Sequence, residues 1–498
     1  MTVAIRVHAA DDVAVVLEQV EPGADVQLLD GGTVTAVDTV PRGHKIALRD
    51  LPSDASVHKY GAVIGRASRA VRAGEHVHSH NLATRLAGLG EYTFASAAAR
   101  PFAPSATATE PFFEGYVRSD GRVGTRNEIW IVATVGCVAR LAQRLAEAGR
   151  GRYAGRIDGV HALTHPFGCS QSGRDLEDTR RVLAALASHP NAGGVLVVGL
   201  GCETNQARAL MASMTRPDEA RVRLLAAQAE GDEFARGLAL LDELVALAER
   251  DVREPCGPEH LCLGLKCGGS DGLSGITANP LVGRMADRVV GLGGRAVLTE
   301  IPEAFGAEQL LLDRAVSCEV FDAAAGVFRD FRAYLTGHGE PLHENPSPGN
   351  IAGGITTLEE KSLGAVQKGG RAPLTSVLRY GERVERAGLA LLEAPGNDAV
   401  SSTALAAAGA NVILFTTGRG TPLGFPVPTL KIASNSELAR RKPSWIDFDA
   451  GAVLASGGAA TAEAELLELV RRTASGAPAR NELNGEREIA LWKRGVTL

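Results

Sequence analysis

The sequence predicts an α/β protein, in which mainly parallel strands alternate with helices, preceded by a small all-β module. Two observations predict the α/β part. From about residue 112 onward, apolar runs of strand length alternate with helical stretches, which is typical of parallel sheets covered by helices. Several of these runs end in a loop that combines glycine with a thiol or polar side chain. The β module is indicated by short strand-like segments separated by turn signals.

The composition is that of a globular protein and excludes some partners. Apolar residues make up 45% of the 498 residues, charged residues 22%, and the formal net charge is −6. An acidic balance without a basic run gives no reason to expect a nucleic acid or membrane partner. The first residues lack the charged start and apolar core of a signal peptide, and no apolar run approaches the roughly 20 residues of a membrane span. We therefore expect a cytoplasmic protein.

The first predicted unit is the β module, residues 1–81. Six of the twelve histidines lie in it, including the alternating series His76-x-His78-x-His80. Side chains on an extended strand repeat with a period of two, so these three imidazoles share one face. They form either a divalent metal site or a solvated polar edge. Residues 82–111, which are rich in Ala, Ser, Thr and Pro, are predicted to be a linker.

Two α/β domains are predicted to follow, residues 112–255 and residues 256–498. Ligands of such sheets bind beyond the carboxyl ends of the strands. The stretch from Leu265 to Pro280 lies at such an end and packs glycines among Cys267, Ser270 and Asp271. Glycine lets a backbone turn sharply and approach a ligand closely. The stretch also contains a Gly-x-Ser-x-Gly pattern, but we favour a ligand-binding loop over a serine nucleophile, because no Asp and His follow in catalytic-looking loops.

Four cysteines follow predicted strands, each beside a glycine: Cys137, Cys169, Cys202 and Cys267. Seven cysteines in a large chain argue against a disulfide framework. If the four loops converge, the thiolates could bind a soft metal or an iron–sulfur cluster. A reactive thiol and simple packing remain the alternatives.

Other strand-end loops carry further candidates. His165 lies in the same predicted loop as Cys169 and is a candidate general acid or base. Arg419 lies between two glycines, and Arg126 lies in a glycine-containing loop near the start of the first α/β domain. The planar guanidinium group suits a carboxylate, so both are candidate substrate ligands.

The motifs resemble those of the altronate/galactarate dehydratase family along essentially the whole chain. The matching stretches are Arg118–Asn127, His165–Cys169, Gly199–Glu203, Cys267–Asp271, Asn345–Asn350 and Thr417–Pro422. Three further stretches, Gly74–Asn81, Pro302–Glu308 and Trp445–Gly451, resemble the altronate-acting branch of the family.

The resemblance implies a hydro-lyase with an N-terminal SAF-type β module and a larger α/β catalytic region. The implied reaction, a step of hexuronate catabolism, converts D-altronate to 2-dehydro-3-deoxy-D-gluconate and water. The implied cofactor is Fe²⁺, with an iron–sulfur cluster or Mn²⁺ as alternatives. A metal bound to the substrate carboxylate and 2-hydroxyl would act as a Lewis acid while a base removes the α proton.

We accordingly expect the following site residues: His165, His44 and His8 for catalysis; Arg126, Ser270, Asp271, Asn350 and Arg419 for substrate binding; and some subset of Cys137, Cys169, Cys202 and Cys267, or else His8 and His44, for the metal. The expected partner is a small sugar acid, and a homo-oligomer is left open. Galactarate, another sugar acid or a sulfonated hydroxy acid is an alternative substrate. A sugar-acid sensor is a remote alternative, because no DNA-reading module is apparent.

Overall fold

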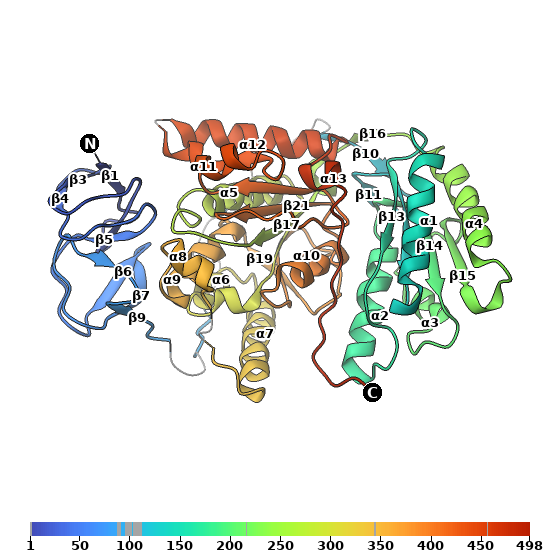
Figure 1. Ribbon diagram of the computed structural model, residues 1–498, viewed down its shortest axis with the longest axis horizontal. Coiled ribbons are helices and arrows are strands. Elements are labelled where there is room, and N and C mark those ends of the chain that lie inside the picture. The colour runs from blue at the N-terminus through green and yellow to red at the C-terminus, as the bar shows by residue number, and fades with distance from the viewer. Residues whose placement is uncertain are drawn as a thin grey trace.

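The computed structural model describes residues 2–86, 91–94, 102, 112–215, 217–342, 345–455 and 457–498. Its elements form three units, with the β module at one end, the first α/β domain at the other and the second α/β domain between them (Figure 1). Most of the predicted linker, residues 82–111, lies outside the described residues. None of the described helices has both the length and the apolar character needed to span a membrane.

The β module consists of two sheets with the strand orders β4-β3-β1-β2-β5-β8 and β6-β7-β9. The strands are β1 (Thr2–Ile5), β2 (Val13–Val16), β3 (Asp25–Leu28), β4 (Thr33–Thr35), β5 (Lys45–Ala47), β6 (Ser56–Lys59), β7 (Ala62–Ala67), β8 (His76–Val77) and β9 (Leu82–Ala83). Strand β9 pairs with β7 and lies beyond the predicted boundary at residue 81. The module therefore extends into the segment predicted as a linker.

The first α/β domain is built on a parallel sheet with the order β13-β12-β14-β15. Its strands are β12 (Glu128–Ala133), β13 (Gly159–Leu163), β14 (Ala192–Gly199) and β15 (Val222–Ala226). Its helices are α1 (Ala139–Arg152), α2 (Gly173–Ala187), α3 (Ala207–Ala212) and α4 (Glu233–Ala248), with short 3₁₀ turns η2 (Gly136–Val138), η3 (Glu219–Arg221) and η4 (Ala227–Ala229). Strands β10 (Phe113–Val117), β11 (Val123–Gly124) and β16 (Glu254–Cys256) form a small antiparallel sheet at the junction with the second domain.

The second α/β domain is built on a parallel sheet with the order β19-β20-β18-β17-β21-β22-β23. Its strands are β17 (Cys262–Cys267), β18 (Arg295–Leu298), β19 (Leu374–Leu378), β20 (Gly388–Leu392), β21 (Val412–Thr417), β22 (Thr429–Ala433) and β23 (Phe448–Asp449). Its α-helices are α5 (Ala278–Gly291), α6 (Glu308–Leu312), α7 (Cys318–Gly337), α8 (Pro348–Ala352), α9 (Leu358–Ala365), α10 (Asp398–Ala407), α11 (Ser436–Arg441), α12 (Gly458–Ala474) and α13 (Arg480–Leu483). The 3₁₀ turns are η5 (Pro258–His260), η6 (Ile301–Ala304), η7 (Val366–Gly369) and η8 (Ala450–Leu454).

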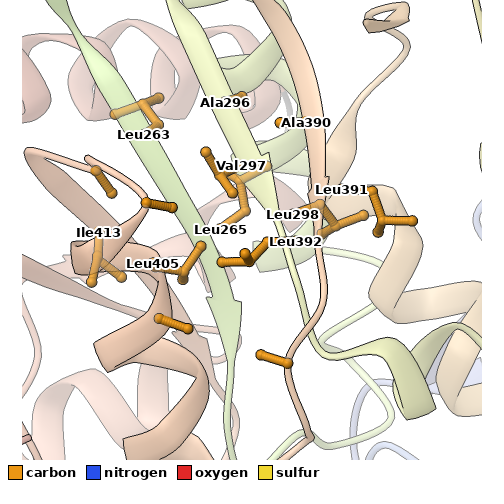
Figure 2. Packing of buried hydrophobic residues seen from close by; sticks show 14 of the residues in the cluster. Leu263, Leu265, Ala296, Val297, Leu298, Ala390, Leu391, Leu392, Leu405 and Ile413 are labelled. Atoms are coloured by element: carbon orange, nitrogen blue, oxygen red, sulfur yellow. The ribbon is translucent and has the colours of Figure 1, made fainter. Parts of the chain in front are cut away.

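The core of this domain lies between the central strands and the helices on both faces. Leu265, Val297, Leu391 and Ile413 come from four neighbouring strands and gather with Leu405 of α10 (Figure 2). All five are buried, and each buried side chain of this size contributes about 2 kcal/mol through the hydrophobic effect. This packing holds the carboxyl ends of the strands, and hence their loops, in fixed positions.

Candidate active site

The β module is joined to the second α/β domain by a buried ion triad. Lys45 and Lys59 of the module each donate to one carboxylate oxygen of Glu360 on α9, both at 2.8 Å. Burial would raise the pKa of Glu360, but the two ammonium groups outweigh it and hold that pKa to about 2. Lys45 also donates to the carbonyl of Gly354 and the hydroxyl of Thr356, at 2.8 and 2.7 Å. The module is thus fixed against α9 by charge-assisted hydrogen bonds.

Glycines allow the backbones of the two units to touch beside this triad. The carbonyl oxygen of Gly43 points at Gly272 and Gly354, and a Cβ atom at these two positions would lie only 2.0 and 2.4 Å from that oxygen. Any side chain at Gly272 would therefore displace backbone. The glycine loop after β17 is in this way brought next to His44, the residue that follows Gly43.

Four histidines of the module form a ring cluster at this contact. His44 Nδ1 lies 3.0 Å from His76 Nε2, and the His44 ring stacks on that of His78 with centroids 4.9 Å apart. His80 packs on His76 with centroids 5.4 Å apart. The predicted series of three imidazoles is therefore gathered, but not along one strand. β8 ends at Val77, and the side chain of Asn81 holds the turn by bonding His78 N and His76 O at 2.9 Å each.

Three rings of this cluster, those of His44, His76 and His78, are held in the neutral form. Burial first, and then neighbouring imidazoles, lower the pKa of His44 to about 4 and that of His76 to about 3. Burial also lowers the pKa of His78. His44 Nε2 faces the carbonyl of Ala352 at 3.4 Å, which can only accept, so Nδ1 of His44 carries a lone pair toward His76. Neutral imidazoles of this kind are metal ligands and proton acceptors.

The glycine loop after β17 is held in place by hydrogen bonds to its residues Ser270 and Asp271. Asp271 Oδ1 accepts from the hydroxyls of Ser274 and Ser434 at 2.8 Å each, and its Oδ2 accepts from Asn435 Nδ2 at 3.0 Å. Asn350 Nδ2 donates to the carbonyl of Ser270 at 2.8 Å. The structure therefore brings the predicted substrate ligands Ser270, Asp271 and Asn350 together. The hydrogen bonds of Asp271 and Asn350 described here hold the loop in place.

Arg419 lies at the same loop and is available for an anion. Its backbone N–H donates to Gly269 O at 3.0 Å, which sets it beside the glycine turn. Its side chain is exposed, and among the described residues no carboxylate forms an ion pair with it. A guanidinium left in this state can receive a substrate carboxylate through two parallel hydrogen bonds.

A second ionisable cluster includes Lys361 of α9, and few features of the sequence pointed to it. Lys266 and Lys368 both bond to Glu300, and Lys361 Nζ lies 2.8 Å from Glu303 Oε1. All five side chains are buried. The signals were a lysine inside the apolar strand β17 and two acidic residues directly after β18.

Cys267 belongs to this buried lysine–glutamate cluster. Its Sγ donates to Glu303 Oε2 at 3.1 Å and accepts from Lys368 Nζ at 2.7 Å. Burial, and then the charges of Glu300 and Glu303, raise the pKa of Cys267 to about 12. The thiol is therefore protonated at neutral pH.

Two donor sets can be tested for a divalent metal. Among the described residues, Cys267, Glu300 and Glu303 are the group that brings three ligand-type atoms within 4.8 Å of one another. This set does not fit a metal, because ammonium groups already occupy both carboxylates and the thiol is protonated. The pair His44 and His76 fits better. Two nitrogens that bind one ion at right angles, each about 2.1 Å from it, lie about 3 Å apart, and these ring nitrogens are 3.0 Å apart.

Three predicted site residues lie elsewhere in the structure. All five N–H groups of Arg126 are used, on Glu482 and on the carbonyls of Thr125, Thr473 and Ala477, so none is left for a substrate. His165 is buried in the first α/β domain, bonded to Ala133 O at 3.0 Å and Phe167 N at 3.1 Å.

His8 is an exposed residue that accepts a hydrogen bond from Ala10 N at 3.1 Å, and it does not join the histidine cluster.

The four cysteines predicted as metal ligands lie in two different domains. Cys267 lies in the buried cluster, whereas Cys137, Cys169 and Cys202 are exposed in the first α/β domain. Cys267 therefore lies apart from the other three cysteines.

Comparison with known proteins gives matches to all three units. Residues 2–85 match the altronate/galactarate dehydratase SAF domain, residues 115–249 the second domain of D-galactarate dehydratase/altronate hydrolase, and residues 258–497 the C-terminal domain of D-galactarate/altronate dehydratase. The chain is 47% identical to an altronate dehydratase of Escherichia coli and 45% identical to one of Bacillus subtilis, over 99% of each pair. It is 33% identical to the galactarate dehydratase (L-threo-forming) of Escherichia coli, over 90% of this chain and 88% of that one.

Proposed function

Because the chain belongs to the altronate/galactarate dehydratase family, we propose that it is a hydro-lyase that converts D-altronate to 2-dehydro-3-deoxy-D-gluconate and water. The observation that carries this proposal is the full-length identity of 47% to an altronate dehydratase, against 33% to a galactarate dehydratase. The contact between the β module and the glycine loop supports the proposal, because it places neutral histidines and an exposed arginine near one another.

The reaction breaks two bonds on neighbouring carbons of the sugar acid. The proton on C2 must be removed, and the hydroxyl on C3 must leave with a proton. A proton beside a carboxylate is weakly acidic, so the negative charge that develops on the carboxylate needs strong electrostatic stabilisation. The site must therefore hold a carboxylate, accept a proton and return one.

The described residues can carry out these steps. We assign the carboxylate to the exposed guanidinium of Arg419 and to N–H groups of the glycine loop, beside the braced Asp271 and Ser270. We assign proton transfer to His78, whose pKa is lowered by burial, so that it is neutral and basic at pH 7. His44 and His76 would hold Fe²⁺, or Mn²⁺ as a substitute. When bound there, the metal supplies a Lewis acid for the substrate oxygens.

The proposal is tested by a substrate panel assayed for 2-oxo acid release. Anaerobically purified protein supplied with Fe²⁺ should turn over D-altronate with a higher kcat/KM than galactarate, other aldonates or a sulfonated hydroxy acid. A preference for another compound would contradict the assignment of altronate. Full activity after exhaustive metal chelation would contradict the metal-dependent mechanism, and it would leave the substrate assignment standing.

A further inference from the structure

The first α/β domain carries three glycine–cysteine pairs at one edge of its sheet. Gly136-Cys137 follows β12, Gly168-Cys169 follows β13 and Gly201-Cys202 follows β14. These strands are parallel neighbours in the order β13-β12-β14. Their carboxyl ends therefore lie side by side, and the three thiols are delivered to the same edge. The active site proposed above does not use any of them.

Hydrogen bonds tie the three loops directly to one another. Gly136 N donates to Phe167 O at 2.8 Å, which joins the first loop to the second. Asn205 joins the third loop to both, because its N–H donates to Gly168 O at 2.9 Å and its Nδ2 to Thr134 O at 3.1 Å. Buried Glu203 accepts from the hydroxyl of Thr134 at 2.7 Å and from Gly201 N at 2.6 Å. The loops form one rigid, cross-bonded unit.

The glycines are required by this packing. Gly168 and Gly201 have φ of +100° and +131°, which side-chain-bearing residues rarely adopt. A Cβ atom at Gly168 would lie 2.2 Å from Thr134 O, and one at Gly136 would lie 3.0 Å from Pro166 O. Each glycine thus allows a loop to approach its neighbour, and the cysteine that follows it is exposed.

The three thiols are not close enough together to share a single ion. All three are free cysteines, so they form no disulfide. Two have side-chain donors directed at sulfur, from Gln228 Nε2 to Cys202 at 3.6 Å and from Ser170 Oγ to Cys169 at 4.0 Å. Thiolates that share one tetrahedral ion lie only about 3.8 Å apart. Among the described residues, no three ligand atoms in this region lie within 4.8 Å of one another. A cubane cluster holds its thiolates farther apart, because each one binds a different iron.

We propose that Cys137, Cys169 and Cys202 bind a [4Fe–4S] cluster, with one iron lacking a protein thiolate and open to solvent. The hydrogen bonds to the sulfur atoms of Cys169 and Cys202 are of the kind that tunes such clusters. The β module with its histidines lies at the opposite end of the molecule from this domain (Figure 1). The cluster site is thus separate from the proposed dehydration site and does not rest on it.

The test uses the full-length protein, purified anaerobically and incubated with ferrous iron, sulfide and dithiothreitol before desalting. We expect about four acid-labile sulfide atoms per chain and visible thiolate-to-iron absorption. Sulfide is the decisive readout, because iron alone could bind the histidines. Cys137→Ser, Cys169→Ser and Cys202→Ser should each lose most of the sulfide. Cys318→Ser, which changes an exposed cysteine on α7, should retain it. Absence of sulfide in the wild type, or its retention in all three variants, would overturn the proposal.

A second measurement does not depend on the folding of variants. Wild-type protein is alkylated with iodoacetamide before and after reconstitution, and the labelled cysteines are identified by mass spectrometry. Cluster binding should protect Cys137, Cys169 and Cys202 and leave the labelling of Cys318 unchanged. Equal labelling of the three thiols in both states would overturn the proposal, whatever the dehydratase activity of the sample.

Discussion

Two groups of ionisable residues differ in how fully their members are paired: the buried lysine–glutamate cluster around Glu300, and the histidine cluster, in which only His44 is buried. In the lysine–glutamate cluster around Glu300, every ammonium group contacts a carboxylate. In the histidine cluster at the contact with the β module, the rings of His44, His76 and His78 are neutral, and Nδ1 of His44 keeps a lone pair directed at His76. Breaking paired charges of the first kind destabilises a structure, whereas neutral imidazoles of the second kind can bind a metal or a proton. The comparison therefore assigns stability to one cluster and chemistry to the other.

The largest effect should come from breaking the paired cluster. Glu300→Gln removes the carboxylate shared by Lys266 and Lys368, which leaves the buried Lys368 without its ion-pair partner and Lys266 with Asp398 alone. We expect the free energy of unfolding to fall by about 3–5 kcal/mol, measured by urea denaturation. Asp54→Asn, which breaks the exposed ion pair with Arg66, is the control and should cost under about 1 kcal/mol. Equal losses in the two variants would contradict the stabilising role.

Changing the histidine cluster should reduce activity and leave stability nearly intact. His76→Gln removes a ring nitrogen of the proposed metal pair, so kcat/KM should fall by about 10²- to 10⁴-fold, measured with D-altronate. His8→Gln changes an exposed histidine of the same module outside the cluster and should retain activity. A larger loss for His8→Gln would favour the residue predicted from the sequence over the one found in the cluster.

At the contact with the β module, the histidine pair and Glu360 should affect the stability of the protein in different pH ranges. His44 and His76 have lowered pKa values, about 4 and about 3, so the unfolded chain binds more protons below its ordinary histidine pKa of 6.5. Stability should therefore be complete above pH 6.5 and fall as the pH drops toward 4. Glu360, with a pKa of about 2, adds stability that is lost only from pH 4.5 downward.

Denaturation curves of the wild type and of a His44→Gln/His76→Gln variant at pH 7.5, 6.0 and 5.0 test this difference. The variant should lose less stability between pH 7.5 and 5.0 than the wild type does. The same slope in both proteins would show that the rings do not titrate as proposed.

The smallest effect should come from Arg419, which acts from the exposed rim of the site. Arg419→Ala should raise KM for D-altronate about tenfold, equivalent to about 1.4 kcal/mol of binding, with kcat changed little. Arg441→Ala, an exposed arginine on α11, should leave KM unchanged. A fall in kcat with no change in KM would indicate that Arg419 acts in the transition state and not in substrate binding.

The fold was predictable from the sequence because its signals are local. Apolar runs ending in glycine marked the strands β12, β14, β17 and β21, and the short strands before residue 82 marked the β module. The histidine series was found for the same reason. What could not be read was that Asn81 ends the strand and folds the series into a cluster.

The roles of single residues depended on partners far along the chain. Cys267 follows a strand just as Cys137, Cys169 and Cys202 do, but Lys368, 101 residues later, makes it part of a buried ionic cluster. Arg126 lies in a glycine-containing loop typical of ligand binding, but Glu482, 356 residues later, binds its guanidinium. The spacing of residues along the sequence does not predict such long-range contacts.

Helix α9 also links the stability of the β module to that of the second α/β domain. Three consecutive residues face different neighbours: Glu359 binds Thr84, Glu360 binds Lys45 and Lys59, and Lys361 binds Glu303. If the β module detached, Glu360 would lose both lysine contacts at once, together with the hydrogen bonds from Lys45 to Gly354 and Thr356. The module and the second α/β domain are therefore coupled as one cooperative unit, and loosening the docked module also weakens the helix that anchors the buried cluster.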